Sequence, residues 1–456
     1  MLGFYGILCY GLGYTISYVN IRSQYELKIT IIPWQNLPLC FSLVVGSDSD
    51  YKNNAMSLAG IDTNFTLPSR FYTSTEIFKE ELERIFYSRW IYVACEADIP
   101  KTGDYVALKI GTRSFFLQRT ERGEVHGFYN VCRHRGHELV PGEKGNRRRL
   151  VCPYHNWTYD LDGKLLNARG MPPGFPSENF GLNPIEVAVI GGLIYVCLTT
   201  PAPRDIEEVR TRLAPYLAPY ELPKTKIACQ KDIIEACNWK LIIENNRECL
   251  HCVSNHPELL VPLYSEGFGK GLDKENVQPS EQRFQEELQE KEREWESLGL
   301  PYELQEFPDG LWFRAVRLPL ANQCISHTMK PEHDCKKLLG AFKRAEGSGL
   351  SLWTHPNSWN HFLSDHIVTF AVFPLAVDRT LVRTKWLVAA DAVEGVDYNL
   401  DDLTKVWTQT NSQDQRLAEG AYRGICSGGY MPGPLADEEY LVKQFLSWYR
   451  DQLTAH

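Results

Sequence analysis

Four candidate metal ligands with an unusual spacing constrain this chain more than any other feature. Cys132 and His134 are separated by one residue, and after a further seventeen residues Cys152 and His155 are separated by two. Two thiolates and two imidazoles form the ligand set of a Rieske [2Fe–2S] centre, in which cysteines bind one iron and histidines bind the other. The alternative is zinc, which also accepts two cysteines and two histidines. Zinc fingers pair cysteine with cysteine and histidine with histidine, so the mixed pairs favour the cluster.

The size and composition of the chain suit a globular protein with two or three domains. It has 456 residues, of which 43% are hydrophobic and 23% charged, as in ordinary folded domains. The net charge of −9 argues against nucleic acid as a partner, because phosphates require a basic face. The 13 cysteines are scattered and odd in number, so we expect no disulfide framework and a cytoplasmic, reducing location.

The first 55 residues differ from the rest. Residues 1–20 carry no charge, but Gly, Tyr, Thr and Ser interrupt them and no basic segment precedes them. Neither a secretory signal nor a membrane-spanning helix fits this pattern well. Met56 begins a segment typical of a natural amino terminus. We therefore expect residues 1–55 to be an extension or part of an over-long gene model, with a weak membrane or targeting segment as the alternative.

Periodicity divides the remainder into three parts. Residues 56–97 are expected to form an N-terminal helical segment, with a helix that begins at Ser74 or Thr75. Short strands from about residue 90 to residue 198 predict an all-β Rieske domain over 98–200, with the ligand pairs at the tips of hairpin-like loops. After a proline-containing link, 205–456 are expected to form an α+β domain. Within it we expect helices at 205–222, at 280–298 and from 402 onward, and strands at 227–236, 311–318, 366–374 and 380–389.

A second group of candidate ligands lies in this last part. On a helix, Glu248 and His251 would face the same way, and His256 follows where the helical pattern ends. Two imidazoles and one carboxylate form the facial triad of non-heme iron(II) oxygenases, which leaves positions open for O2 and substrate. Asp365 and Asp414 are both candidates for the carboxylate, and the residues alone do not separate them. These could also be ordinary polar residues, but an electron-transfer centre upstream requires an electron acceptor.

Two cysteines flank this histidine. Cys249 and Cys252 form a Cys-x2-Cys pattern around His251. We interpret them as packing residues and not as ligands, because a helix would turn them away from the iron.

With both motifs in place, the chain resembles the oxygenase (α) subunit of Rieske non-heme iron oxygenases over about residues 65–456. Within that family it is most similar to the quaternary-ammonium demethylases. The stretches that carry the resemblance are ENNRECLHC (244–252), HPEL (256–259), WNHFLSDH (359–366), TKWLVAADAVEGVDY (384–398), VWTQTNSQDQRLAEGAYRGI (406–425) and MPGPLADEEYLVKQFLSWY (431–449).

The resemblance implies an α+β fold with an all-β Rieske domain. Beside it lies a catalytic domain whose antiparallel sheet wraps around a long helix, with the N-terminal helical segment packed on the catalytic domain. Matched to the family motif, His251, His256 and Asp414 would hold the mononuclear iron, so the resemblance favours Asp414 over Asp365.

The resemblance also implies a homotrimer. Glu248 corresponds to a carboxylate that bridges subunits, so that an electron passes from His155 of one subunit towards His251 of the next. Ring-hydroxylating relatives commonly have Asp at this position, and Glu here departs from them.

The implied reaction is N-demethylation. Two electrons from a separate reductase and one O2 would hydroxylate an N-methyl carbon of a quaternary ammonium compound, with glycine betaine, giving dimethylglycine and formaldehyde, as the expected substrate. Stachydrine, carnitine, choline or an aromatic acid are alternative substrates, and a Rieske electron carrier without oxygenase activity is the rival function. No Gly-rich nucleotide-binding fingerprint is present, so we expect flavin and NAD(P)H on the reductase.

A trimethylammonium group is best held by aromatic faces. An aromatic run in the last part of the chain is therefore the candidate substrate site, although most such clusters are simply core. Its members are Trp353, Trp359, His361 and Phe362.

Overall fold

The computed structural model describes residues 61–267, 279–307 and 311–454, together with two short strands near the amino terminus. Those strands are β1 (Leu27–Lys28) and β2 (Ser42–Leu43), which pair antiparallel. The chain divides into two compact units, Met1–Ile61 and Asp62–His456. The remaining expectations for residues 1–55 and for Met56 lie outside the described residues. No helix in the described part of the chain is long and apolar enough to cross a bilayer.

The N-terminal segment of the second unit is helical, as expected. The hydroxyl of Ser74 accepts a hydrogen bond from the backbone N–H of Ile77 at 3.2 Å, which makes Ser74 the N-cap. The ring of Phe86 packs edge-to-face against Trp239, with ring centres 5.0 Å apart, so this segment lies against the catalytic region. Its elements are α2 (Arg70–Thr73), α3 (Thr75–Glu81) and the π-helical turn η2 (Leu82–Phe86).

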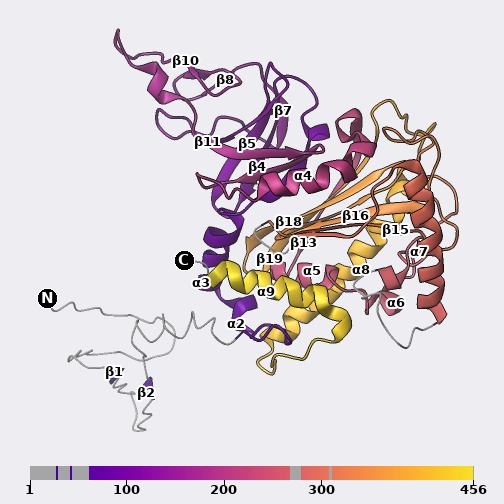
Figure 1. Ribbon diagram of the computed structural model, residues 1–456. Helices are drawn as coiled ribbons and strands as arrows, with labels where there is room; N and C mark the ends of the chain where they lie inside the picture. The colour runs from indigo at the N-terminus through magenta and orange to yellow at the C-terminus, as the bar shows by residue number, and fades with distance from the viewer. Residues whose placement is uncertain (1–26, 29–41, 44–60, 268–278, 308–310, 455–456) are drawn as a thin grey trace. The chain divides into compact units, whose positions relative to one another are not determined.

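The Rieske region is all-β. A seven-stranded antiparallel sheet has the order β3-β12-β11-β6-β5-β4-β7, and a three-stranded sheet has the order β10-β9-β8 (Figure 1). The larger sheet begins at Ile91, ahead of the boundary expected at residue 98, because β3 pairs with β12. The strands are β3 (Ile91–Cys95), β4 (Asp104–Ile110), β5 (Arg113–Arg119), β6 (Val125–Tyr129), β7 (Lys144–Asn146), β8 (Leu150–Val151), β9 (Thr158–Tyr159), β10 (Leu165–Asn167), β11 (Pro184–Ile190) and β12 (Leu193–Cys197), with short 3-10 turns η3 (Glu96–Asp98) and η4 (Ser177–Phe180).

The catalytic region is a second seven-stranded antiparallel sheet, in the order β13-β19-β18-β17-β16-β15-β14. Its strands are β13 (Thr225–Glu235), β14 (Gln305–Phe307), β15 (Phe313–Pro319), β16 (Ser348–Thr354), β17 (Ser358–Phe362), β18 (Ile367–Ala376) and β19 (Arg379–Ala389). Its helices are α4 (Ile206–Leu217), α5 (Trp239–Asn246), α6 (Cys252–Asn255), α7 (Pro279–Leu298), α8 (Leu400–Cys426) and α9 (Tyr440–Thr454). The 3-10 turns are η5 (Ala218–Tyr220), η6 (Leu222–Lys224), η7 (Ser265–Gly267) and η8 (Asp437–Glu439).

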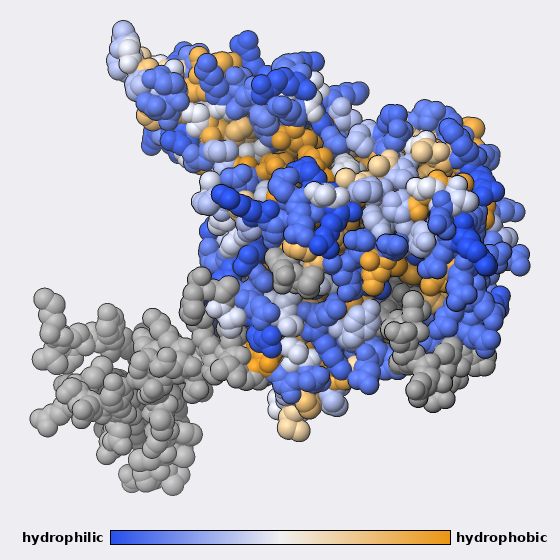
Figure 2. Space-filling view, viewed as in Figure 1, coloured by the Kyte–Doolittle hydropathy of each residue, from blue (hydrophilic) through white to orange (hydrophobic). Residues whose placement is uncertain are grey.

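The long helix α8 lies along this sheet (Figure 1). Asn399 caps its start by accepting from the backbone N–H groups of Asp401 and Asp402. On the buried side, Lys231 of β13 donates to the hydroxyl of Thr408 at 2.9 Å. The expectation of an antiparallel sheet around a long helix is confirmed. The highly charged helix α7 lies on the surface, where the face shown in Figure 2 is mainly hydrophilic.

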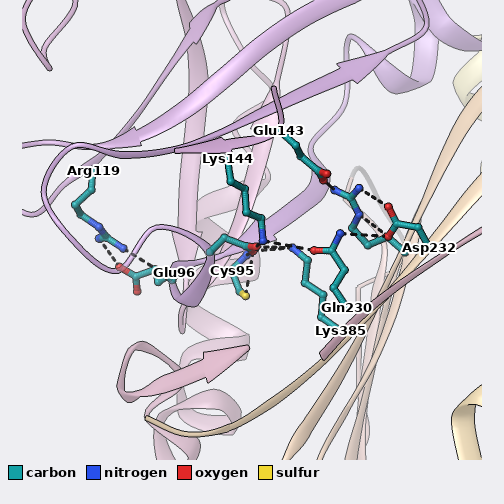
Figure 3. Close-up of polar contacts among 10 residues, drawn as sticks. Cys95, Glu96, Arg119, Glu143, Lys144, Gln230, Asp232 and Lys385 are labelled. Atoms are coloured by element: carbon teal, nitrogen blue, oxygen red, sulfur yellow. Dashed lines mark hydrogen bonds and ion pairs between the residues drawn. The ribbon is translucent and has the colours of Figure 1, made fainter. Parts of the chain in front are cut away.

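Ion pairs join the Rieske region to the catalytic sheet (Figure 3). The buried carboxylate of Asp98 accepts from Lys144 of β7 at 2.7 Å and from Lys385 of β19 at 2.7 Å. Burial alone would raise the pKa of Asp98, but the ammonium groups of Lys385 and Lys144 outweigh burial and hold this pKa well below its usual value. Arg383 of β19 pairs with Asp232 and with Glu143 of the Rieske region.

Candidate metal centres and substrate cavity

Two loops of the same construction carry the Rieske ligand pairs. The backbone N–H groups of Cys132 and Cys152 each donate to the carbonyl five residues later, both at 2.8 Å. The fourth residue after each cysteine, Gly136 or Asn156, has a positive φ of 74° or 58°. Glycine and asparagine adopt this left-handed conformation most readily. The expected hairpin-like loops are therefore present, and strands β8 and β9 flank the second one.

The side chains of these loops fit a [2Fe–2S] cluster. Cys132 and Cys152 are buried, and the rings of His134 and His155 lie 4.5 Å apart. The Nδ1 atom of each histidine is buried and has no hydrogen-bond partner among the described residues. Trp157 stacks on His134 with ring centres 4.8 Å apart, which fixes that imidazole. Two inward thiols and two inward ring nitrogens suit the divided ligand set of a Rieske centre.

The second ligand group lies on a turn. The expected helix through Glu248 and His251 is wrong, because α5 ends at Asn246 and a turn connects it to α6. The backbone N–H of Leu250 donates to Oε2 of Glu248 at 2.5 Å, which stabilises this turn. His256 follows the last residue of α6 directly, as expected.

The structure brings His251, His256 and Asp414 together. Oδ1 of Asp414, on α8, lies 3.4 Å from Nε2 of His251 and 2.9 Å from Nε2 of His256. The opposite ring nitrogens are held elsewhere: Nδ1 of His251 contacts Glu248, and Nδ1 of His256 contacts Oε1 of Gln413 at 2.8 Å. Both Nε2 atoms are thus directed at one carboxylate, an arrangement that suits a divalent iron.

The charged groups of this cluster favour a positive charge between the two histidines and Asp414. Burial lowers the pKa of His251, but the carboxylates of Asp414 and Glu248 outweigh burial and raise this pKa to about 9. The two imidazoles in turn outweigh the effect of burial on Asp414 and lower its pKa. A metal ion bound by the imidazoles and the carboxylate would supply positive charge at this place.

Asp365 has other partners. It is fully buried and accepts from the hydroxyl of Ser326 at 2.7 Å, from Nδ1 of His366 at 3.0 Å and from the backbone N–H of Asp334 at 3.0 Å. These contacts use both of its oxygens, so the geometry favours Asp414 as the ligand.

Cys249 and Cys252 form a disulfide across His251. The expectation that one helix turns both away is wrong, since Cys249 lies at the turn and Cys252 is the first residue of α6. The sulfur of Cys252 is within 4.8 Å of a ring nitrogen of His251 and of His256. A disulfide sulfur is not a thiolate, so in this state Cys252 is no strong competitor for the metal.

A small cavity lies beside Asp414. Its volume is about 30 Å³, enough for about two water molecules. Its lining residues come from β13, β17, β19, α5 and α8. They are Glu235, Ile242, Asn245, Asn246, Trp359, Val382, Trp407, Asn411, Asp414 and Ala418.

Two of the expected substrate residues belong to this region. Trp359 lines the cavity and stacks on Phe370 of β18, with ring centres 4.9 Å apart. His361 is not among the lining residues, but its ring stacks on that of Trp407, with ring centres 4.5 Å apart. Burial holds the pKa of His361 down, to about 3, so this imidazole is neutral at pH 7.

The other two lie elsewhere. Phe362 points to the opposite face of the sheet, as strand alternation requires, and packs on Tyr220 at 5.2 Å. Trp353 shares the face of Trp359 but lies against the guanidinium of Arg247, 5.1 Å from its ring centre.

Sequence reasoning missed three residues of the site. Trp407 precedes Asp414 by two helical turns, so helical spacing could have placed it on the same face of α8. Gln413, which holds His256, is adjacent to Asp414 but shows no motif of its own. Glu235 is the last residue of β13, and no motif in the neighbouring sequence indicates that it belongs to the site.

Comparison with known families agrees with this organisation. The family model described as "Rieske [2Fe-2S] domain" matches residues 89–187, and that described as "Ring hydroxylating alpha subunit (catalytic domain)" matches residues 221–455. A solved structure of a quaternary ammonium Rieske monooxygenase superposes with a TM-score of 0.64 at 22% identity, covering 87% of this chain and 97% of that one. Naphthalene 1,2-dioxygenase from Rhodococcus sp. superposes with a TM-score of 0.59 at 19% identity, covering 89% and 98%. These structures show the fold.

Sequence relatives cover most of the chain. The glycine betaine monooxygenase oxygenase subunit of Pseudomonas aeruginosa is 41% identical over 404 residues, which are 88% of this chain and 92% of that protein. The corresponding subunit of Chromohalobacter salexigens is 40% identical over 390 residues, 85% and 86% of the two chains. The chain belongs to the family of ring-hydroxylating oxygenase α subunits, with a Rieske [2Fe–2S] domain followed by the mononuclear iron domain.

Proposed function

We propose that this chain is the terminal oxygenase of a system that demethylates glycine betaine to dimethylglycine and formaldehyde. The observation that carries the proposal is the cavity beside Asp414, which Trp359 and Trp407 line and which has no basic side chain among its lining residues. Such a space suits a methylated ammonium ion. The 41% identity to relatives named for glycine betaine supports this substrate. Stachydrine, carnitine and choline carry the same kind of group and are the alternatives.

The proposed ligands follow from the geometry above. When bound, the mononuclear iron would supply the reduction of O2 and the hydroxylation of an N-methyl carbon. Glu248 and Gln413 hold the Nδ1 sides of the two histidines, so both rings present Nε2 to the metal. The cluster would be held by Cys132, His134, Cys152 and His155, and the iron by His251, His256 and Asp414.

The remaining components would be separate. A reductase would carry the flavin and NAD(P)H and would supply two electrons, one at a time. We place the reaction in the cytoplasm, which suits the thiols at the cluster.

We further propose that electrons cross between subunits of a head-to-tail homotrimer through Glu248. Tyr154, whose ring centre is 3.8 Å from that of His155, is 50% exposed, and Leu250, next to His251, is 49% exposed. Apolar side chains exposed beside both centres suit burial in a contact between subunits.

Single turnover tests the reaction. The reduced, iron-loaded chain is mixed with glycine betaine and O2, and formaldehyde is measured. We expect close to one formaldehyde per active site and three irons per chain. Two irons per chain and no formaldehyde would instead indicate an electron carrier.

Complementation tests the path between subunits. One variant, Asp414→Ala, lacks an iron ligand, and another, Cys152→Ser, lacks a cluster ligand. Each alone should be inactive, whereas trimers assembled from both should release formaldehyde. Inactive mixed trimers that bind both metals would refute transfer between subunits.

A further inference from the structure

One charged side chain of the cavity has no part in the ligand geometry. Glu235 is the last residue of β13 and is 3% exposed. Strand alternation places it on the same face as Lys231, which donates to α8, so Glu235 also faces α8. Its carboxyl group therefore lines the same cavity as Trp359, Trp407 and Asp414.

This carboxyl group lacks a counter-charge. Among the described residues, its hydrogen bond is with the thiol of Cys237, whose Sγ lies 3.8 Å from Oε2, and no basic side chain forms an ion pair with it. Burial, followed by the nearby carboxylates of Asp414 and Glu419, raises the pKa of Glu235 to about 8. A buried carboxylate without a partner is unfavourable, and a bound cation would relieve this.

The rest of the cavity also suits a cation. The aromatic residues Trp359 and Trp407 line it, together with the uncharged residues Asn245 and Asn411. The cation that the proposed substrate carries is a trimethylammonium group. Such a group cannot donate N–H hydrogen bonds, so aromatic faces and a carboxylate are what can recognise it.

We propose that Glu235 is the counter-charge that selects the quaternary ammonium group of the substrate. The ammonium group lies between Glu235 and the indoles, with an N-methyl group beside the iron site at Asp414. This inference rests on the proposed function and names the residue that distinguishes a charged substrate from a neutral one of the same shape.

Ligand binding to the full-length, metal-loaded protein under anaerobic conditions tests this role. Glycine betaine is compared with 3,3-dimethylbutanoate, in which carbon replaces the ammonium nitrogen. Glu235→Gln should weaken betaine binding by about 10- to 100-fold, because it removes a charge at close range. Binding of the carbon analogue should stay unchanged, so the preference for betaine should disappear.

Two further variants separate this role from a structural one. Glu235→Asp keeps the charge and should keep part of the preference. Glu419→Gln removes an equal charge on α8 outside the cavity lining, where Glu419 accepts from Ala236. It should not lower the preference, because it only removes a repulsion that raises the pKa of Glu235. If Glu235→Gln does not fold, comparison of Glu235→Asp with Glu419→Gln still tests the prediction, because only the former should reduce the preference.

Failure of this inference differs from failure of the proposed function. An unchanged preference in Glu235→Gln, or loss of turnover with binding intact, would overturn the role of Glu235. If the wild type forms no formaldehyde from betaine, the same comparison is made with choline and 3,3-dimethylbutanol. A preference for the cation that depends on Glu235 would then uphold the inference while the substrate changes, and equal binding of both pairs by the wild type would overturn it.

Discussion

The carboxylate of Asp98 provides a quantitative test of how the Rieske and catalytic regions are joined. Its side chain is 0% exposed and accepts from Lys385, which is 3% exposed, and from Lys144, which is 37% exposed. Asp98→Asn keeps the shape but leaves Lys385 as a buried cation without a carboxylate, which costs about 3–5 kcal/mol. The exposed Lys144 adds less than about 1 kcal/mol. We expect the free energy of unfolding to fall by about 3–5 kcal/mol.

Denaturant unfolding at pH 7, followed by tryptophan fluorescence, measures this loss of free energy. The value is taken from the unfolding transition that occurs at the lowest denaturant concentration. The matched control is Glu121→Gln, whose carboxylate pairs with Arg148 on the surface at 65% and 66% exposure and should change stability by less than about 0.5 kcal/mol. The double variant Asp98→Leu with Lys385→Met should recover most of the loss, because it removes both buried charges.

The free energy of unfolding of Asp98→Asn should depend on pH differently from that of the wild type, and the direction of the difference follows from the pKa of Asp98. The pKa of Asp98 is depressed in the folded chain, so its stabilisation is complete above the unfolded pKa of about 3.9 and is lost as pH falls towards the folded value. The variant should therefore lose less stability than the wild type on acidification below about pH 4. A loss at pH 7 no larger than that of the surface control would refute the reasoning.

Three further predictions concern the iron domain. Gln413→Leu should weaken iron binding by about 10- to 100-fold, measured by chelator competition, because His256 loses its Nδ1 partner; unchanged affinity would contradict this. Burial raises the pKa of Glu244 to about 8 from an ordinary value of 4.5, so its stability contribution declines as pH rises between these values. Glu244→Gln should remove that decline in a series of unfolding measurements, and parallel pH profiles would refute it. Trp359→Leu should weaken betaine binding about 10-fold, whereas Phe362→Leu, on the opposite face, should affect stability alone; equal effects on binding would count against the cavity.

The sequence predicted the features that depend on local spacing. The mixed Cys/His pairs, the Ser74 cap and the alternation of the catalytic strands are all set by neighbouring residues, and the structure contains them. The helix expected through Glu248 failed because distant contacts decide that segment. The side chain of Arg247 is fully buried and donates to the carbonyl of Ser358 on β17, 3.4 Å away. This contact lies directly after Asn246, the last residue of α5, where the helix ends.

The substrate cavity was only partly predictable for a similar reason. Trp359 stands out in an aromatic run, but Trp407 and Glu235 approach it from α8 and from the far edge of the sheet. No short-range pattern links positions so far apart in the chain, and their proximity depends on the order in which the strands pair.

The two centres present opposite nitrogens of imidazole. His134 and His155 leave Nδ1 free at the cluster, whereas His251 and His256 leave Nε2 directed at the iron site. Magnetic resonance can therefore separate the centres by isotope position. Histidine labelled with ¹⁵N at Nδ1 alone would give directly coordinated nitrogen couplings from the reduced cluster and remote couplings from the mononuclear iron. A sample labelled at Nε2 alone would give the reverse.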